Sequence, residues 1–276
     1  MAPHVQRSLP TKKSRETIFK EIINQCKLDS GFDTQSSDLE LVYCNVNPTD
    51  GQVIAESLKA DSIFERSRGR INYNPVTEVL RVKIMTSEIH EAPVRWLNTE
   101  FGHMMRTGWL TAGEIELMDF GSPGPEFHGF QGRYIGAKKT ADWICRADTD
   151  RFPRILVEVG WTEIFPRLRQ DKDLWIRGAA DVQLVILVNW NKLRHGRVNG
   201  TVEVWGRDNA GDPMLIHEEQ IFPGGGNQVI PLTRGQIFGN SLLPNRNAND
   251  VWNLEVSRLR VKAGEKLAAM SLTPAT

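Results

Sequence analysis

The chain has 276 residues, of which 40% are hydrophobic and 25% are charged, a composition typical of an ordinary globular protein. Its 34 Lys and Arg residues balance its 34 Asp and Glu residues, so no overall field attracts a polyanion, and any polyanion site must be local. The three cysteines, Cys26, Cys44 and Cys145, lack the spacing of a disulfide framework or a zinc site, which favours a reducing compartment.

No apolar run is long enough to span a bilayer, and no signal peptide is recognisable. We therefore expect an intracellular protein of the nucleus or cytoplasm that is not secreted and does not use a membrane. Composition and turn signals predict three segments. They are a partly disordered N-terminal extension over residues 1–70 with one helix at 15–27, a core over 71–240, and a C-terminal tail over 241–276.

The first clear elements lie at the start of the core. Apolar runs at 71–73 and 79–84 flank a turn and predict a β-hairpin. A helix follows from near residues 90–92, because Pro93 is tolerated only in a first turn, and Gly108 ends it.

The apolar stripe of this helix decides which side chains face inward. Apolar residues recur at every third or fourth position from Val94 to Met105. Stepping back three residues from Val94 reaches Glu91, so we expect Glu91 rather than His90 on the inward face.

Three other charged or ionisable positions are expected to face solvent. Glu100 and His103 have the spacing of a carboxylate di-iron motif, but the motif occurs once and lies off the apolar stripe. Glu203 lies in residues 201–205, which alternate between apolar and polar residues as a half-exposed strand does.

The centre of the chain contains an unusual charge. Glu158 lies within the apolar, β-branched run 155–159, which predicts a buried strand. The run 182–188 is apolar on both parities, as in a strand covered on both faces. Residues 164–176 between them are long enough for a helix, so we expect a right-handed βαβ unit with parallel strands.

A second carboxylate precedes this unit. Asp142 lies at the start of a short predicted strand over 141–145, which could place it beside Glu158. Two carboxylates on adjacent strands suit a hard cation such as Mg²⁺ or Mn²⁺, which takes oxygen ligands and keeps several waters. The alternative is that Glu158 is structural and pairs with an arginine such as Arg154 or Arg169.

Lys172 is the candidate cation for this site. It lies between Leu168 and Trp175 on one stripe of the predicted helix. A lysine on an inward stripe suits a contact with an anion, so Lys172 could stabilise charge in a transition state. It could also pack its stem and extend its ammonium into water.

The remaining elements follow from turn signals. Residues 192–197 form a basic turn before the strand at 201–205, whose hairpin partner is expected at 214–221. Short strands are predicted at 115–118 and at 229–232, the latter closing the sheet. A helix near 261–270 completes the predicted tail.

These pieces resemble the PD-(D/E)XK phosphodiesterase superfamily, most closely its branch of inferred restriction endonucleases. The likeness covers about residues 71–238. Lys139-Thr140-Ala141-Asp142 corresponds to a K-x-P-D segment with Ala for Pro, and Glu158-Val159 to the end of the apolar strand. A helix with a lysine and an aromatic, a strand and a hairpin then follow. Gly160 stands where the parent E-x-K motif has lysine.

The resemblance implies an α/β fold with a restriction-endonuclease-like three-layer core, a mixed central sheet and a C-terminal β-hairpin extension. It also implies a Mg- or Mn-dependent endonuclease acting on DNA, with a homodimer as an open option. Asp142, Glu158 and Lys172 would be catalytic, with Glu91 supporting the metal. Lys139 and Arg169 would contact the substrate. The alternative is a catalytically inactive nuclease-fold protein that binds nucleic acid or protein.

Overall fold

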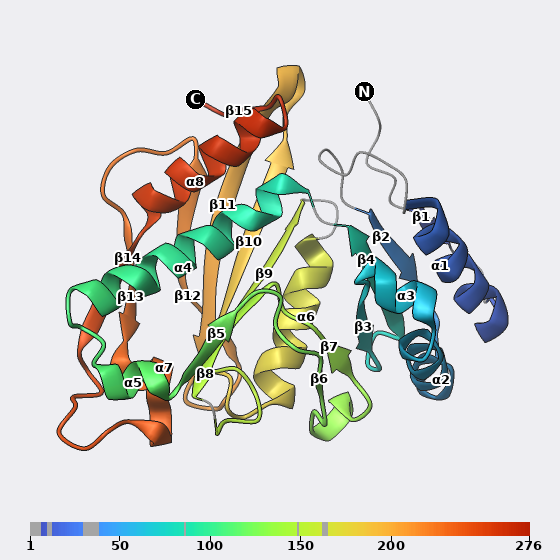
Figure 1. Cartoon of the computed structure of the whole chain (residues 1–276), viewed down its shortest axis with the longest axis horizontal. Coiled ribbons are helices and arrows are strands. Elements are labelled where there is room, and N and C mark those ends of the chain that lie inside the picture. The colour runs from blue at the N-terminus through green and yellow to red at the C-terminus, as the bar shows by residue number, and fades with distance from the viewer. Residues whose placement is uncertain (1–6, 10–12, 30–38, 86, 148, 162–164) are drawn as a thin grey trace. The chain divides into compact units, whose positions relative to one another are not determined.

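The computed structural model describes all residues except 1–6, 10–12, 30–38, 86, 148 and 162–164. The chain is a mixed α/β protein with two compact units (Figure 1), formed by residues 1–87 with 125–140 and by residues 88–124 with 141–276. The N-terminal extension was expected to be partly disordered, and its residues 1–6, 10–12 and 30–38 lie outside the described residues, whereas Arg7–Leu9 form a strand. None of the described helices combines the length and apolarity needed to cross a membrane.

The first unit is a sheet covered by helices. Its strand order is β1-β2-β4-β3-β7-β6. The strands are β1 (Arg7–Leu9), β2 (Leu39–Tyr43), β3 (Arg70–Asn74), β4 (Val79–Met85), β6 (Phe127–His128) and β7 (Lys138–Lys139). The helices are α1 (Arg15–Asp29), α2 (Pro48–Lys59) and α3 (Ser62–Ser67). The hairpin predicted from runs 71–73 and 79–84 is confirmed as antiparallel β3–β4.

This unit buries one side of its elements. Ile18, Ile22 and Ile23 of α1 pack with Leu41 of β2 and Leu80 of β4. The helix predicted at 15–27 is therefore confirmed, and its stripe supplies part of a core. In the described part of the extension, two further helices (α2 and α3) and two strands (β1 and β2) form that the sequence did not predict.

The second unit contains a larger mixed sheet with the path β12-β11-β10-β9-β8-β5, and β15 pairs with β11. Its strands are β5 (Met118–Gly121), β8 (Trp143–Ala147), β9 (Ile155–Trp161), β10 (Leu184–Lys192), β11 (Arg197–Arg207), β12 (Pro213–Phe222) and β15 (Thr273–Pro274). β9 and β10 are parallel and joined through α6 (Phe165–Gly178), which confirms the βαβ unit. Ile164, at the start of the predicted helix, lies outside the described residues.

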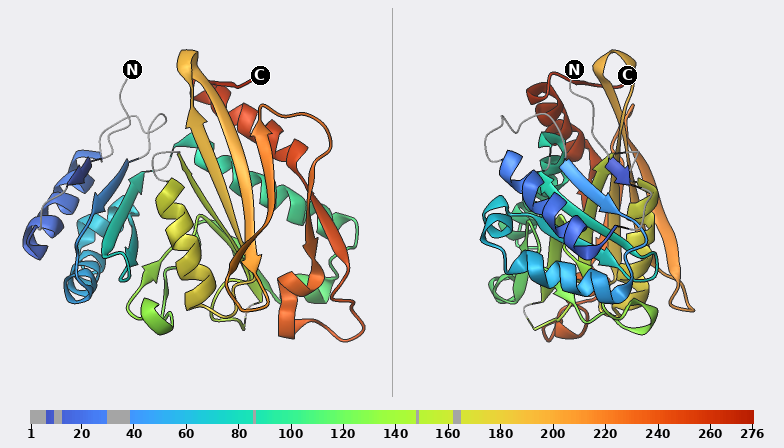
Figure 2. Two further views of the ribbon diagram at one scale, coloured as in Figure 1. Left: turned by 180° about the vertical axis from the view of Figure 1, so that it is seen from behind. Right: turned by 90° about the vertical axis from the view of Figure 1, so that its right-hand side faces the viewer.

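Helices cover both faces of this sheet. α4 (Glu91–Arg106) and α8 (Val256–Ala269) pack together over one face, and α6 covers the other (Figures 1 and 2). Val157 and Val159 of β9 share a core with Phe101 of α4 and Leu259 of α8. Three layers result, with β9 and β10 in the middle.

Two short predictions were wrong. Residues 112–116 form the helix α5 (Ala112–Glu116), because Thr111 and Glu114 make a capping box, and β5 starts only at Met118. The strand expected at 229–232 does not close the main sheet. It is β13 (Val229–Thr233), which pairs with β14 (Val251–Glu255) in a separate two-stranded sheet.

The predicted boundaries also differ from the two units. The expected tail 241–276 provides β14 and α8, and Val256, Leu259 and Leu267 of α8 are buried in the core of the second unit. Residues 127–139 return to the first unit, where β7 pairs with β3. The boundaries of the two units are set by strand pairing and helix packing between segments that are distant in the sequence. Local composition carries no information about such contacts.

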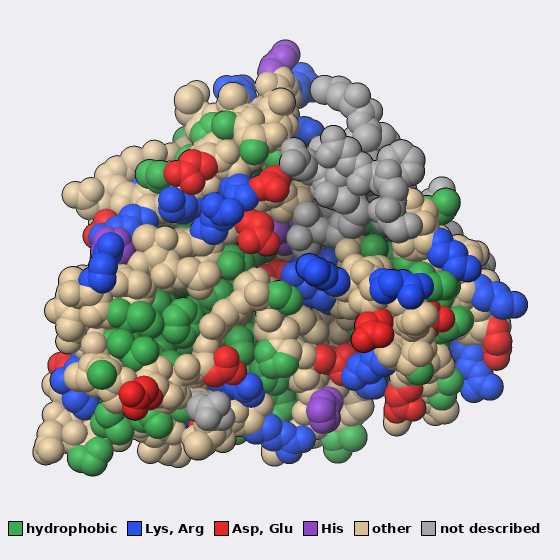
Figure 3. Space-filling view, viewed as in Figure 1, with side chains coloured by type: hydrophobic (Ala, Val, Ile, Leu, Met, Phe, Trp, Pro, Cys, Tyr) green, Lys and Arg blue, Asp and Glu red, His purple; other side chains and the backbone are tan. Residues whose placement is uncertain are grey.

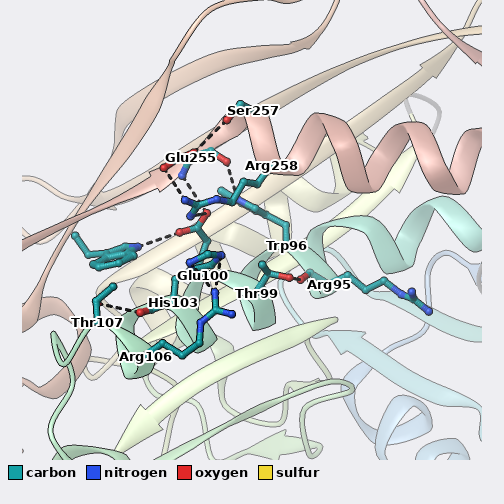
Figure 4. Close-up of polar contacts among 11 residues, drawn as sticks. Arg95, Trp96, Thr99, Glu100, His103, Arg106, Thr107, Glu255, Ser257 and Arg258 are labelled. Carbon is teal, nitrogen blue, oxygen red and sulfur yellow. Dashed lines mark hydrogen bonds and ion pairs between the residues drawn. The ribbon is translucent and has the colours of Figure 1, made fainter.

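Glu100 is not solvated as expected. Its side chain is fully buried between α4 and the β14–α8 junction (Figure 4). Oε1 accepts hydrogen bonds from Arg258 Nη1 at 2.9 Å and from the Glu255 amide at 3.3 Å, while Oε2 accepts one from Trp252 Nε1 at 3.0 Å. The side of α4 next to its apolar stripe therefore packs against the β14–α8 junction. Glu100 lies on that side, which is why it is buried although it is off the stripe. His103 is half-buried and contacts Arg106.

A second buried carboxylate joins α5 to α7 (Arg234–Phe238). Glu114 is ion-paired to the buried Arg234 and to Arg246, and it accepts hydrogen bonds from Thr111. Burial alone would raise the pKa of Glu114, but the hydrogen bonds from Thr111 and the two guanidinium groups outweigh it and hold the pKa below its ordinary value.

Replacing Glu114 by Gln should lower the free energy of unfolding at pH 7 by about 1.5–3 kcal/mol, because Arg234 and Arg246 lose a charged hydrogen-bond acceptor while Arg234 keeps its ion pair with Asp250. A carboxyl with a lowered folded-state pKa contributes stability above its unfolded value of 4.5 and loses it as pH falls through the folded value. The difference between wild type and variant should therefore narrow below about pH 4.5. Urea unfolding of both proteins between pH 7 and pH 3 measures this difference in unfolding free energy. A difference that does not change with pH would contradict the lowered pKa of Glu114.

Candidate functional site

The candidate site is built on β9, whose seven residues are all buried. Side chains of a strand alternate between faces, and Ile155, Val157, Val159 and Trp161 enter the core shared with α4 and α8. Glu158 therefore projects to the opposite face, which α6 covers. Glu158 is the only charged residue of β9, and its side chain points toward α6.

Two side chains hold the backbone of Val159, the residue after Glu158. Asp142 Oδ2 accepts a hydrogen bond from the Val159 amide at 2.8 Å. His90 Nε2 lies 2.9 Å from the Val159 carbonyl oxygen, and because a carbonyl only accepts, this nitrogen donates. The last register pair of β8 with β9 is Trp143 with Val157. Asp142 and His90 thus replace the strand partner that β8 no longer provides at Val159.

Glu158 is oriented from the other side of the sheet. Its Oε1 accepts a hydrogen bond from Trp175 Nε1 of α6 at 2.9 Å, and both side chains are buried. The bond satisfies part of the hydrogen-bonding capacity of a carboxylate that would otherwise be costly to bury. The predicted core role of Trp175 is confirmed, and this tryptophan also links α6 to β9.

Asp142 and Glu158 lie on adjacent chain segments, as expected. Asp142 immediately precedes β8, its amide donates to the Val157 carbonyl at 3.0 Å, and its carboxylate reaches the residue after Glu158. Two buried carboxylates fit the preference of Mg²⁺ for oxygen ligands, and each can accept further bonds beyond the one N–H described. N–H donors that orient a carboxylate are also typical around metal ligands.

A third protein ligand is not apparent. Among the described residues, no three His, Cys, Asp or Glu side chains gather in a way that could hold a metal ion. Glu91 is half-buried, whereas His90 is 3% exposed, so the expectation that Glu91 rather than His90 faces inward was wrong. A step of three residues back from Val94 reaches Glu91 and a step of four reaches His90, which lies in the 3₁₀ turn Glu88–His90 just before α4, and the four-residue step gives the buried side chain.

Glu203 was expected to face solvent, and it is buried instead, with 2% of its surface exposed. It lies in one row with Glu158, since both are register partners of Leu187 on β10. Arg169 of α6 forms an ion pair with Glu203, and Trp205 Nε1 donates to Glu203 Oε2 at 2.8 Å. The alternation of apolar and polar residues placed Glu203 on the correct face of β11. That face is covered by α6 and is not exposed to solvent.

The structure places the two other α6 candidates over β11. Lys172 is buried, as its inward stripe predicted, and its ammonium lies 3.8 Å from the centre of the Trp205 ring and 2.7 Å from Asp173 Oδ1. Arg169 is about half exposed and, besides Glu203, contacts the Phe165 ring. Arg169 therefore does not pair with Glu158, and Arg154 pairs with Asp150.

Lys139 belongs to the first unit, where it lies on β7 with its side chain buried. The neighbouring Thr140 amide donates to Asn72 Oδ1 of β3 at 3.0 Å. The Lys139–Asp142 segment thus leaves one unit and enters the other between Thr140 and Ala141.

Sequence reasoning missed two polar residues of this region, His90 and Glu203. For His90 a signal was present, because it lies four residues before the inward-facing Val94. For Glu203 the signal was weaker. Only the pairing register reveals that it shares a row with Glu158.

Comparison of the chain with protein-family models, curated proteins and solved structures finds no match. The site is therefore interpreted from its own geometry.

Asp142→Ala should lower the free energy of unfolding by about 1–3 kcal/mol, because the buried Val159 amide would lose its acceptor. Asp142→Asn keeps an acceptor oxygen and should cost less. Denaturant unfolding of the two variants tests this, and equal losses would show that the hydrogen bond to Val159 does not account for the effect.

Proposed function

We propose that this chain is a divalent-metal-dependent nuclease with a restriction-endonuclease-like core that hydrolyses DNA phosphodiesters. The observation that carries the proposal is the placement of two buried carboxylates, Asp142 and Glu158, on adjacent segments of a mixed sheet. Each is oriented by an N–H donor, from Val159 and from Trp175. The order of elements around β9, α6 and β10 also agrees with the resemblance drawn from the sequence.

Asp142 and Glu158 would hold Mg²⁺ or Mn²⁺, which when bound supplies Lewis-acid polarisation of a phosphoryl oxygen and an activated water. The protein residues provide the fixed geometry. The Val159 peptide aligns the Asp142 carboxylate, and Trp175 restricts the Glu158 side chain. Glu91 would support the site through water, which its half-buried position permits.

Lys172 would stabilise negative charge on the phosphate, and Arg169 would contact the substrate, whereas Lys139 is fully buried in the first unit. In the structure the Lys172 ammonium contacts the Trp205 ring and Asp173. A cation–π contact contributes about 0.5–2 kcal/mol, so a phosphate can compete for this ammonium. The proposed role requires Lys172 to change rotamer when substrate binds.

The second candidate function is a catalytically inactive nuclease fold that binds nucleic acid or protein. Two observations favour it. Gly160 occupies the position of the E-x-K lysine. Lys172, the residue that would replace that lysine, already has an anionic and an aromatic partner.

Millimolar Mg²⁺ or Mn²⁺ should raise the melting temperature of the wild type. Metal bound only by the native state stabilises it by about 1.4 kcal/mol when free metal is roughly tenfold above Kd. For a protein of this size that is about 3–5 °C. Glu158→Gln keeps an acceptor for Trp175 but removes one ligand charge, so it should abolish the response and raise the metal-free melting temperature by relieving repulsion from Asp142.

Glu203→Gln is the matched control, because Glu203 is buried in the same row but paired with Arg169. It should retain the metal response. An unresponsive wild type together with a destabilised Glu158→Gln would make Glu158 structural and favour the inactive alternative.

Lys172→Met should reduce DNA cleavage by about 10²–10³ fold, the usual loss on removing one preorganised charge. The metal-induced thermal shift should stay unchanged, since lysine is not a ligand. A cleavage assay at saturating Mg²⁺ compares the two proteins. Equal rates would exclude Lys172 from the mechanism and transfer its role to an arginine such as Arg169.

A further inference from the structure

The turn between β10 and β11 carries a concentrated positive charge. Lys192, Arg194, His195 and Arg197 are all exposed there within six positions. We call these four residues the basic tip. Residues 189–200 contain no Asp or Glu, although the whole chain has no net charge. The tip forms one end of the second unit in Figure 1, and Figure 3 shows Lys or Arg and His side chains gathered at that end.

Within the described part of the chain, no acidic side chain neutralises the charges of the basic tip. Other cations of the second unit do pair with carboxylates, as Arg177 does with Asp212 and Lys266 with Glu88. Among the described residues, no side chain of the basic tip has an ion pair or hydrogen bond. The adjoining segment 269–275, which includes β15, also lacks acidic side chains.

The tip is held firmly despite its exposure. The Leu193 amide donates to the Arg197 carbonyl at 2.7 Å and closes the turn, with His195 and Gly196 at positive φ. Below it, the Trp190 ring lies against Gly200, where a Cβ would meet ring atoms at 2.4 Å. The Ala275 amide donates to the Val198 carbonyl at 2.8 Å. A stiff turn of this kind presents its cations with little loss of backbone entropy on binding.

We propose that the basic tip binds the phosphodiester backbone of duplex DNA. The choice of DNA rests on the proposed function. Lys192 lies five residues beyond Leu187, the register partner of Glu158, which is about 17 Å along the strand direction at 3.3 Å per residue. That distance equals about five base-pair steps of 3.4 Å, so one duplex spans both positions.

The composition of the tip favours nucleic acid over an anionic membrane. Loops and helices that enter a membrane interface combine basic residues with exposed large apolar ones. Leu193 is the sole apolar residue from 192 to 197, and it is half-buried. The turn offers point charges without an apolar wedge, which suits a phosphate backbone.

The test is fluorescence anisotropy of labelled duplex DNA in EDTA, so that neither cleavage nor metal binding enters. Binding is measured over a range of salt concentrations for the wild type and for Lys192→Ala/Arg194→Ala/Arg197→Ala. Three lost phosphate contacts should reduce the slope of log K against log salt by about 2.7. The corresponding loss of affinity at 0.1 M salt is about 10²–10³ fold.

Arg15→Ala/Lys20→Ala/Arg66→Ala is the control, because it removes the same charge from exposed positions of α1 and α3. This control variant should keep most of the wild-type slope of log K against log salt. Arg194→Lys/Arg197→Lys retains the charge and should bind nearly as the wild type does, which separates charge from folding defects. Melting curves of all variants accompany the binding data.

Equal binding by the tip variant and the control would overturn the proposal, as would a wild type that binds duplex RNA or anionic vesicles but not duplex DNA. The proposed nuclease function fails separately, through an absent metal response in the wild type. If DNA binding depends on the basic tip but metal does not raise the melting temperature, the DNA-binding role of the tip is retained. The catalytically inactive nuclease fold then becomes the favoured function.

Discussion

A carboxylate buried in the middle of a sheet must be compensated, and the second unit is arranged around this constraint at Glu158. The indole of Trp175 reaches it from α6, so the crossover helix is joined to the strand by a polar contact as well as by apolar packing. Asp142 binds the Val159 amide and His90 binds the Val159 carbonyl, so the backbone is fixed on both sides of this residue. Three elements that are distant in the sequence therefore meet at two consecutive residues of β9.

The same solution recurs elsewhere in this unit. Glu100, Glu158 and Glu203 each accept a hydrogen bond from a tryptophan indole, and Glu100 and Glu203 also have an arginine partner. An indole donates an N–H while its ring adds apolar packing, which suits a site where a charge has to enter a core. For Glu158 the described donor is the Trp175 indole, and the two arginines considered for it, Arg154 and Arg169, pair with other carboxylates.

The sequence was informative about β9, α6 and β10 because continuous apolar strands and a helical stripe determine a βαβ unit almost alone. It also placed Asp142 beside Glu158. The errors share one cause. Periodicity assigns a side chain to a face but does not say what covers that face, so Glu203 and Glu100 were placed in solvent although α6 and the β14–α8 junction lie over them. His90 was misassigned because a helical stripe allows steps of three and of four residues, and only the step of four from Val94 leads to the buried side chain.

The chain enters the second unit at Glu88, returns to the first at Pro125, and leaves it again after Thr140. During synthesis the first sheet must therefore wait for β6 and β7, which emerge after α4, a helix of the other unit. The face of α4 that holds Glu100 stays uncovered until Trp252 and Arg258 have been made. Contacts so far apart in the chain slow folding, and neither unit can be excised as one continuous piece. The core of the second unit is complete only after α8 has been made, so its apolar surface stays exposed on the nascent polypeptide until late in synthesis, which is the surface that chaperones shield.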